Sequence, residues 1–224
     1  MKQFIKSFEW NWFELALIGT VSIAAIYFFI AAAAGGEWVL SLLDLVAAIT
    51  GIFSVVLCAK GKKSGFIFGL VNVVAYSIIA FNSFYFGEVM LNVLFYVPMN
   101  IASYFLWKKN QETDKQEVKC RALNWKQICI GIVIIAVITF FYHLALASLG
   151  GAMTLLDGTT TILSIVATIL MATRYSEQWL CWIVTNIITV VMWVIAGNPV
   201  MVVMWGAYLV NAFYGYWRWR KNSK

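Results

Sequence analysis

Residues 108–121 read KKNQETDKQEVKCR, and they form the one long polar stretch in a chain that is otherwise dominated by apolar runs. Hydrophobic residues make up 62% of the 224 positions and charged residues only 12%, against about 25% in a typical soluble domain. A soluble fold of this size could not bury so much apolar surface. The composition therefore excludes a soluble enzyme, a nucleic-acid-binding module and a disordered chain. It predicts an all-α polytopic membrane protein, because the apolar runs are continuous rather than alternating as in a β-barrel.

The apolar runs on both sides of this linker are long enough to cross a membrane. Each has about 19 to 24 residues, which as a helix spans the roughly 30 Å hydrocarbon core of a bilayer. All sixteen Lys and Arg residues fall at segment ends on a single side of the membrane. By the positive-inside rule that side is the cytoplasm, so we expect both termini there. The predicted transmembrane helices are eight in number and cover 13–34, 38–60, 64–86, 89–107, 126–149, 155–173, 178–197 and 199–218.

The chain also contains an internal repeat, because the segment from Leu42 to Lys109 resembles the segment from Leu155 to Lys221. Each copy begins with Leu-Leu-Asp, carries one asparagine in its second helix and another in its third, and ends in an aromatic and basic run. The matching positions are Asp44 and Asp157, Asn72 and Asn186, and Asn100 and Asn211.

Three helices per copy is an odd number, so the single helix between the copies makes them parallel. We therefore expect an extra N-terminal helix plus a 3+1+3 parallel-repeat core. Parallel repeats of this kind often hold a solute at their interface near the bilayer midplane, which predicts a transporter. The expected divisions are an N-terminal region with the extra helix (1–37), a first three-helix repeat (38–109), a cytoplasmic linker with the central helix (110–150), and a second repeat with a basic tail (151–224).

Polar and aromatic side chains recur at three- and four-residue spacing on the second and third helices of each repeat, which places them on one face. Such a face suits a flat polar solute, because rings stack on its plane while amides bind hydroxyls or a carboxamide. The alternative is that amides and hydroxyls only join helices, while Trp and Tyr form interfacial belts. Trp107, Trp217 and Trp219 fit such a belt better than a site. The candidate substrate-binding residues are Trp182, Thr185, Asn186, Trp205, Tyr208, Asn211, Asn72, Tyr76 and Asn100.

Absent charges narrow the class of solute. No Lys or Arg lies in the interior of a predicted span, which argues against nucleotides and sugar phosphates. A cationic solute is compatible with this site, because the faces of Trp and Tyr rings attract cations. Asp44 and Asp157 lie within about two turns of a span end, where they either cap helices or line a gate or outer vestibule. Pro98 should kink its helix and is a further gate candidate. Neither the four cysteines nor the single His143 shows metal-ligand spacing, so we expect no metal and no cofactor.

Two motifs carry a family resemblance: Trp182-Ile-Val-Thr-Asn186 and Trp205-Gly-Ala-Tyr-Leu-Val-Asn211, followed by a closing Tyr-x-x-Trp with basic residues. Together with the repeat, they resemble the PnuC family of bacterial vitamin transporters, whose 3+1+3 core is similar to that of SWEET transporters. The resemblance covers about residues 38–221. It implies nicotinamide riboside as the substrate, facilitated diffusion by alternating access, and a multi-pass location in the bacterial inner membrane. It also implies homotrimers and trapping of the product through phosphorylation by a cytoplasmic riboside kinase, in support of NAD biosynthesis.

The resemblance further implies that Trp182 and Trp205 pack around the nicotinamide, and that Asn186, Asn211 and Thr185 bond the ribose or the amide. Related branches resemble carriers of thiamine or riboflavin, and these stay as alternatives. A membrane receptor or enzyme is an alternative of another class, but the sequence offers no nucleophile–base pair and no metal cluster. We therefore expect no enzyme and no nucleic-acid partner. The residues that would complete the cavity are Asn72, Tyr76, Asn100 and Tyr208.

Overall fold

The computed structural model describes residues 10–36, 38–82, 86–111, 117–148, 154–195 and 199–223, and nearly all of them lie in helices. The stretch α5–η1–α6 stands where the sequence predicted one span, so eight helical segments match the eight predicted ones to within a few residues. The predicted all-α fold is confirmed. In chain order the elements are α2 (Trp12–Ala34), α3 (Trp38–Ala59), α4 (Gly65–Asn82), α5 (Phe86–Leu91), the π-helix η1 (Asn92–Tyr96), α6 (Val97–Lys109), α7 (Trp125–Ser148), α8 (Thr154–Ala172), α9 (Gln178–Ile195) and α10 (Pro199–Asn222).

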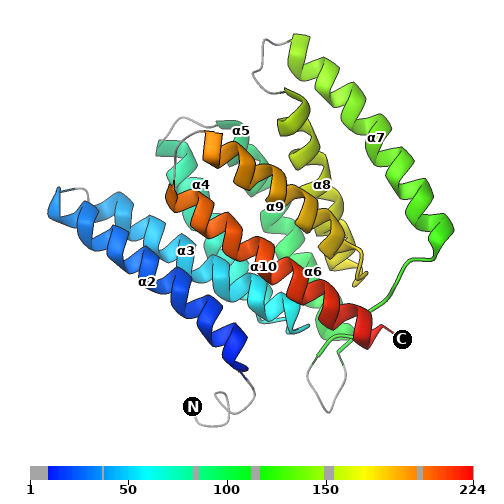
Figure 1. Ribbon diagram of the computed structural model, residues 1–224, viewed down its shortest axis with the longest axis horizontal. Helices are drawn as coiled ribbons and strands as arrows, with labels where there is room; N and C mark the ends of the chain where they lie inside the picture. The colour runs from blue at the N-terminus through cyan, green and yellow to red at the C-terminus, as the bar shows by residue number, and fades with distance from the viewer. Residues whose placement is uncertain are drawn as a thin grey trace.

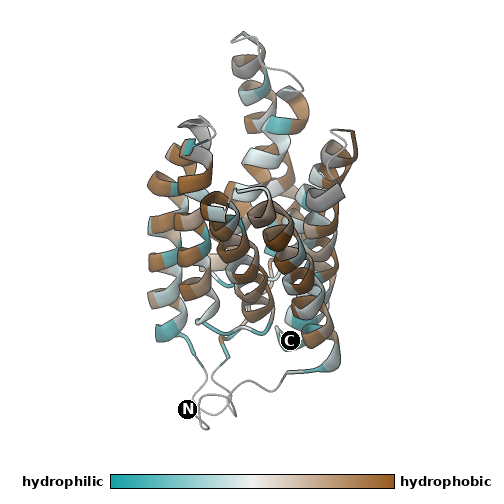
Figure 2. Cartoon of the chain, turned by 90° about the vertical axis from the view of Figure 1, so that its left-hand side faces the viewer, coloured by the Kyte–Doolittle hydropathy of each residue, from teal (hydrophilic) through white to brown (hydrophobic). Residues whose placement is uncertain are grey.

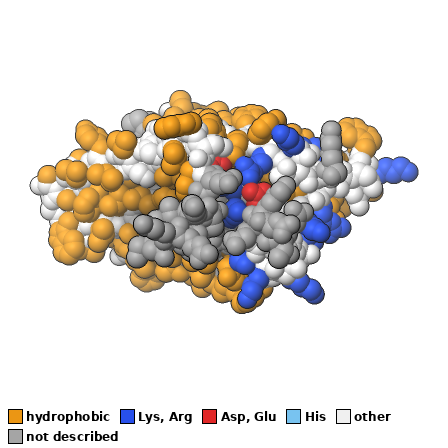
Figure 3. Space-filling view, turned by 90° about the horizontal axis from the view of Figure 1, so that it is seen from below, with side chains coloured by type: hydrophobic (Ala, Val, Ile, Leu, Met, Phe, Trp, Pro, Cys, Tyr) orange, Lys and Arg blue, Asp and Glu red, His pale blue; other side chains and the backbone are white. Residues whose placement is uncertain are grey.

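Apolar residues predominate along the helices, as the brown colour in Figure 2 shows, and many of their side chains are exposed. On α7, Val133 and Phe141 leave 62% and 65% of their surface exposed. Lys and Arg side chains gather toward one end of the face seen in Figure 3, apart from the apolar surface. This outer surface is suited to lipid. Within the described residues, five helices are long and apolar enough to cross a membrane, namely Trp12–Ala34, Trp38–Ala59, Val89–Lys109, Trp125–Ala145 and Thr154–Ala172.

The helices form two triplets that pack against each other (Figure 1). In the first triplet α4 packs on α3 and α6, and in the second triplet α9 packs on α8 and α10. Between the triplets, α3 packs on α10 and α6 packs on α8, so first and third helices meet in the same way twice. Among the described helices α7 packs on α8 alone, while α2 packs on α3 and α10. This is the predicted 3+1+3 core with an extra N-terminal helix.

The helix that contains Pro98 is not a regular α-helix. The residues just before it form the π-helical turn η1, in which the N–H of Val97 reaches back to the carbonyl of Asn92. Pro98 has no N–H to donate, and its ring crowds the preceding turn, so the chain forms its hydrogen bonds there with a longer repeat. The sequence predicted a kink at Pro98, and the departure from regular geometry lies in the turn before it.

Several of the best-buried large side chains form one cluster at the basic end, where α3 ends and α9 begins. This tryptophan cluster is built around Trp107, Trp179, Trp219 and Phe66. Trp107 and Trp219 are 0% and 1% exposed, and their ring centroids lie 5.4 Å apart. Trp179 stands 6.1 Å from Trp219. Because these rings come from α6, α9 and α10, with Phe66 from α4, the cluster closes both triplets together at this end.

The assignment of Trp107 and Trp219 to an interfacial belt is therefore wrong. Their indole N–H groups donate to carbonyls in the last turns of other helices, Trp219 to Cys58 at 3.2 Å and Trp107 to Met171 at 2.9 Å. A helix C-terminus leaves such carbonyls without intrahelical partners, so an indole can satisfy them and be buried. The position of a tryptophan near the end of a predicted span does not reveal whether its ring is buried in this way. Trp217, by contrast, is 62% exposed, as an interfacial residue would be.

The described part of the linker covers the tryptophan cluster. Val118 is 5% exposed within the cluster, and its N–H donates to the Gly61 carbonyl at 2.9 Å. The Arg121 N–H donates to the Arg174 carbonyl, and the Arg121 carbonyl accepts from the Ser176 N–H, both at 2.8 Å. Burial lowers the pKa of the Arg174 guanidinium, and the neighbouring Arg121 charge lowers it further. The linker thus ties loops of both triplets together at the basic end.

Candidate solute-binding site

Three of the four predicted asparagines donate a hydrogen bond to a backbone carbonyl. Asn72 on α4 donates through Nδ2 to Ala47 of α3 at 2.7 Å, and Asn100 donates to a carbonyl of its own helical segment at 2.8 Å. Asn211 on α10 is 1% exposed and donates across the triplets to Val55 of α3 at 3.1 Å. Its Oδ1 atom is buried and has no partner among the described residues. An amide has a second hydrogen and a carbonyl oxygen, so these side chains can also bind a solute.

Gly51 on α3 brings polar side chains of both triplets together. A Cβ atom at this position would lie 2.5 Å from the hydroxyl of Tyr208 on α10 and 2.9 Å from Nδ2 of Asn72 on α4. Both distances are shorter than a side-chain carbon tolerates, so the missing side chain is what lets the two groups meet over the α3 backbone. The structure therefore places two predicted site residues from different triplets at one point.

Gly69 on α4 has a similar role within the first triplet. A Cβ atom there would lie 2.5 Å from Oδ1 of Asn100 and 2.9 Å from Oγ of Ser54. Ser54 was not among the predicted site residues. Its signal in the sequence is its place three residues after Gly51, near the same face of the helix. A lone serine in an apolar run is also typical of a helix-joining residue, and only the packing separates the two interpretations.

Helices α9 and α10 contribute the remaining buried members of the predicted site. Thr185 and Asn186 are 2% and 3% exposed, and Oγ1 of Thr185 has no partner among the described residues. Trp182, one turn earlier, packs against the tryptophan cluster. On α10, Trp205 stands edge-to-face to Tyr208 with ring centroids 5.6 Å apart. Aromatic faces beside uncharged amides and hydroxyls can bind a flat, polar molecule.

Four predicted residues occupy more exposed positions. Tyr76, one turn beyond Asn72, leaves 38% of its surface exposed. Asp44 and Asp157 are exposed near the starts of α3 and α8, at the other end of these helices from the tryptophan cluster, and Pro98 is exposed on α6. These four residues are exposed, whereas the amides of Asn186 and Asn211 are buried. Their roles in solute binding or gating stay predictions. Within the described residues, no group of three or more His, Cys, Asp and Glu side chains could hold a metal ion.

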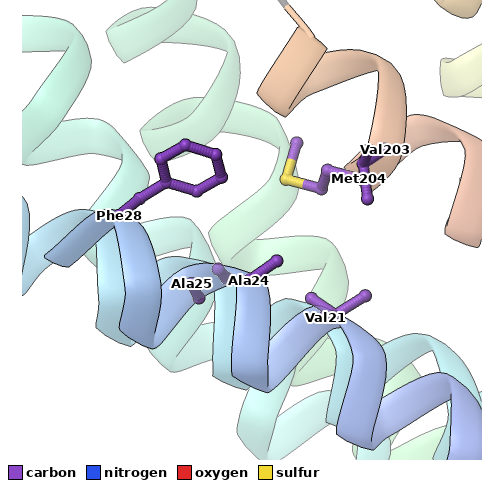
Figure 4. A pocket seen from close by; sticks show the side chains of 7 residues that line it. Val21, Ala24, Ala25, Phe28, Val203 and Met204 are labelled. Carbon is purple, nitrogen blue, oxygen red and sulfur yellow. The ribbon is translucent and has the colours of Figure 1, made fainter. Parts of the chain in front are cut away.

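The pocket in Figure 4 lies away from these residues, between α2, α3 and α10. Its volume is about 50 Å³, whereas pockets for drug-sized ligands measure roughly 300–1,000 Å³. It is too small for a nucleoside and offers no polar side chain. This pocket is therefore not the predicted solute site. The pocket is lined by Val21, Ala24, Ala25, Phe28, Ala48, Val203 and Met204.

A buried ion pair fastens the extra helix α2 to both triplets near the basic end. Glu14 is 0% exposed and accepts from Nζ of Lys60, just after α3, at 2.6 Å and from the hydroxyl of Tyr214 on α10 at 2.7 Å. Asn11 caps α2 and exchanges hydrogen bonds with Glu14 in a capping box. The Tyr214 hydroxyl also accepts from Arg218 at 3.2 Å. Sequence reasoning missed this network, whose signal was a carboxylate just inside an apolar run.

The chain is similar to known membrane transporters in sequence and in structure. A family model described as nicotinamide mononucleotide transporter matches residues 41–221. The nicotinamide riboside transporter PnuC of Haemophilus influenzae is 37% identical over 217 residues, which cover 96% of this chain and 92% of that protein. The protein of the same name from Neisseria mucosa is 39% identical over 194 residues, covering 82% and 74%. A crystal structure of the vitamin B3 transporter PnuC matches with a TM-score of 0.77 at 37% identity, covering 96% of this chain and 93% of that one.

The fold and the buried polar site define a multi-pass membrane transporter. This chain belongs to the nicotinamide mononucleotide transporter family, in which the matched curated relatives carry the name PnuC. The resemblance to the PnuC family that the two tryptophan–asparagine motifs indicated is confirmed.

Proposed function

We propose that this chain carries nicotinamide riboside across the membrane by facilitated diffusion. The observation that carries the proposal is the approach of Asn72 and Tyr208, from different triplets, at Gly51. The uncharged side chains of Thr185, Asn186 and Asn211 are buried on α9 and α10. Nicotinamide riboside has a flat cationic ring, a carboxamide and ribose hydroxyls. Aromatic faces attract such a ring, and amides bind its polar groups. The names of the curated relatives support the same solute.

The riboside fits this site better than the mononucleotide in the family description. The mononucleotide adds a phosphate, which inside a membrane protein normally meets Arg or Lys. The sequence has neither in the span interiors. Lys60, a buried lysine after α3, already pairs with Glu14. Thiamine and riboflavin are the rival solutes, and a membrane receptor or enzyme is the rival class.

We infer alternating access between two repeats, residues 38–109 and 151–224, joined by the linker and central helix of residues 110–150. The extra helix within residues 1–37 lies outside the repeats. Because α3 packs on α10 and α6 packs on α8, rocking of one triplet against the other would open one end of the site at a time. The tryptophan cluster and Val118 close the basic end in this conformation, so inward opening requires their separation.

The proposed cellular setting depends on the positions of the basic residues and on the effect of phosphorylating the riboside. The positions of the basic residues support a bacterial inner-membrane protein with both termini in the cytoplasm. A cytoplasmic riboside kinase would trap the solute, because the added phosphate prevents its return through an uncharged path. The kinase would then perform the chemistry of NAD biosynthesis, and the carrier itself would be no enzyme. We also propose that three copies of this chain assemble into a homotrimer.

Parallel titrations test which solute the protein binds. Purified protein is titrated with nicotinamide riboside, its 5′-phosphate, thiamine and riboflavin, and uptake of labelled riboside is followed in proteoliposomes. We expect saturable binding and uptake of unmodified riboside, with the 5′-phosphate at least about tenfold weaker. Binding of thiamine or riboflavin alone would move the protein to a rival solute. Chemical conversion of the riboside during uptake would overturn the transporter proposal.

A further inference from the structure

Gln178, the first residue of α9, is a fully buried amide that has no hydrogen-bond partner in the described part of the chain. Its side chain is 0% exposed, and neither Nε2 nor Oε1 has a partner among the described residues. Most buried polar atoms in proteins are hydrogen-bonded, and an unpaired buried amide is costly. An apolar side chain of the same size would serve better if this position only filled space. The amide therefore calls for a partner in another conformation of the transporter.

Other buried polar atoms on α6, α9 and α10 resemble those of Gln178 in having no partner among the described residues. Trp182 and Thr185 follow it at four and seven residues on the same face of α9. Oγ1 of Thr185 is unpaired within the described structure, and so are Oγ of Ser103 on α6 and Oδ1 of Asn211 on α10. Thus α6, α9 and α10 each contribute a buried polar atom that has no partner within the described structure.

The tryptophan cluster brings the basic ends of these three helices together. Trp107 of α6 and Trp179 of α9 both pack on Trp219 of α10, with ring centroids 5.4 Å and 6.1 Å apart. Gln178 precedes Trp179 directly. If the triplets separate at this end, Trp107 of the first triplet parts from Trp219 of the second, and the amide of Gln178 gains access to the path that leads away from Thr185.

Amides that join helices or cap turns in this protein look different from Gln178. Asn82 at the end of α4 and Asn110 just after α6 each donate to the carbonyl four residues earlier, at 2.9 and 2.7 Å. The amide of Gln178 makes no such bond with the described residues. A helix-joining role therefore does not account for it.

We propose that Gln178 forms a second binding position for the solute at the cytoplasmic end of the pathway. There it holds the solute as it leaves the site between the triplets. Its amide offers two donors and a carbonyl acceptor, a match for the carboxamide and ribose hydroxyls of a riboside. These groups stay unpaired in the closed conformation and become paired when the solute passes. This inference depends on the proposed transport of nicotinamide riboside.

The test compares Gln178→Met with wild type and with Leu180→Met, a conservative change at a partly exposed position two residues further along α9. Initial uptake of labelled riboside is measured in proteoliposomes, together with the equilibrium Kd and the Tm. We expect Gln178→Met to take up riboside about tenfold more slowly, the effect of losing one or two net hydrogen bonds. Its Kd should stay within about threefold of wild type, and its Tm should be unchanged or higher by about 2 °C. Leu180→Met should match wild type.

Wild-type uptake in Gln178→Met, with an unchanged or raised Tm, would overturn the inference and leave a merely structural residue. Gln178→Asn provides a second readout, because it withdraws the amide by one bond, roughly 1.5 Å. Its uptake should fall between those of wild type and Gln178→Met, and should be below wild type even if the Met variant does not fold. Failure of wild-type protein to bind or move riboside would refute the proposed function instead, which keeps the two failures apart.

Discussion

The ion pair that anchors the extra helix gives the sharpest stability prediction. Glu14 and Lys60 have side chains only 0% and 4% exposed, and their charged atoms lie 2.6 Å apart. Replacing Glu14 by Leu removes the carboxylate and leaves the Lys60 ammonium buried without its counter-charge. Loss of one partner from a buried pair typically destabilises a protein by about 3–5 kcal/mol. At roughly 2–4 °C per kcal/mol for a chain of this size, Glu14→Leu should lower the Tm by about 6–20 °C.

The double variant Glu14→Leu with Lys60→Met removes both charges, so no buried charge is left uncompensated. Replacing a whole buried pair by apolar residues is often close to neutral. The carboxylate also accepts charge-assisted hydrogen bonds from Tyr214 and from the Asn11 N–H, and both variants lose these bonds alike. We therefore expect the double variant to be less stable than wild type but to unfold at a clearly higher temperature than Glu14→Leu.

Thermal unfolding of the purified protein in one detergent measures all variants on the same scale. Arg220→Gln is the matched control, because Arg220 pairs with Glu177 at 3.3 Å but is 48% exposed on its side chain. The Glu177 side chain is 7% exposed, but without Arg220 it keeps hydrogen bonds from Ser176 and from the Leu123 N–H, so Arg220→Gln should lower the Tm by less than Glu14→Leu does. A double variant that unfolds at or below the temperature of Glu14→Leu would refute the reasoning, since the two charges would then act independently.

Three further predictions concern the site. Gly51→Ala should weaken riboside binding by about tenfold or more, because overpacking of a close contact costs about 1–3 kcal/mol; Gly206→Ala, where a Cβ atom would meet nothing within 4 Å, should bind like wild type, and equal Kd values by calorimetry would contradict the role of Gly51. Asn186→Leu should abolish binding while keeping the helical circular dichroism spectrum, and retained affinity would remove this residue from the site. In proteoliposomes, the 5′-phosphate should fail to compete with riboside uptake, and strong competition would show that the path accepts a phosphate.

Much of the architecture could be predicted because a bilayer imposes simple demands on a sequence. A helix needs about 20 apolar residues to cross it, and basic residues stay on one side, so the eight segments and their ends could be read directly. The repeat on either side of the linker predicted two three-helix units with a single helix between them. It also predicted that Asn72 and Tyr208, which meet at Gly51, would belong to one site.

By itself, the sequence determined the helical segments, the 3+1+3 order and the absence of Lys and Arg from the interiors of the predicted spans. These depend on composition and on spacing along one helix. Only the tertiary structure decided which side chains meet across helices. It buried Trp107 and Trp219 rather than leaving them in an interfacial belt, joined Glu14 to Lys60, and left the Gln178 amide without a partner. The reason is that a contact between distant positions depends on the rotation and depth of both helices, and periodicity within one helix carries neither.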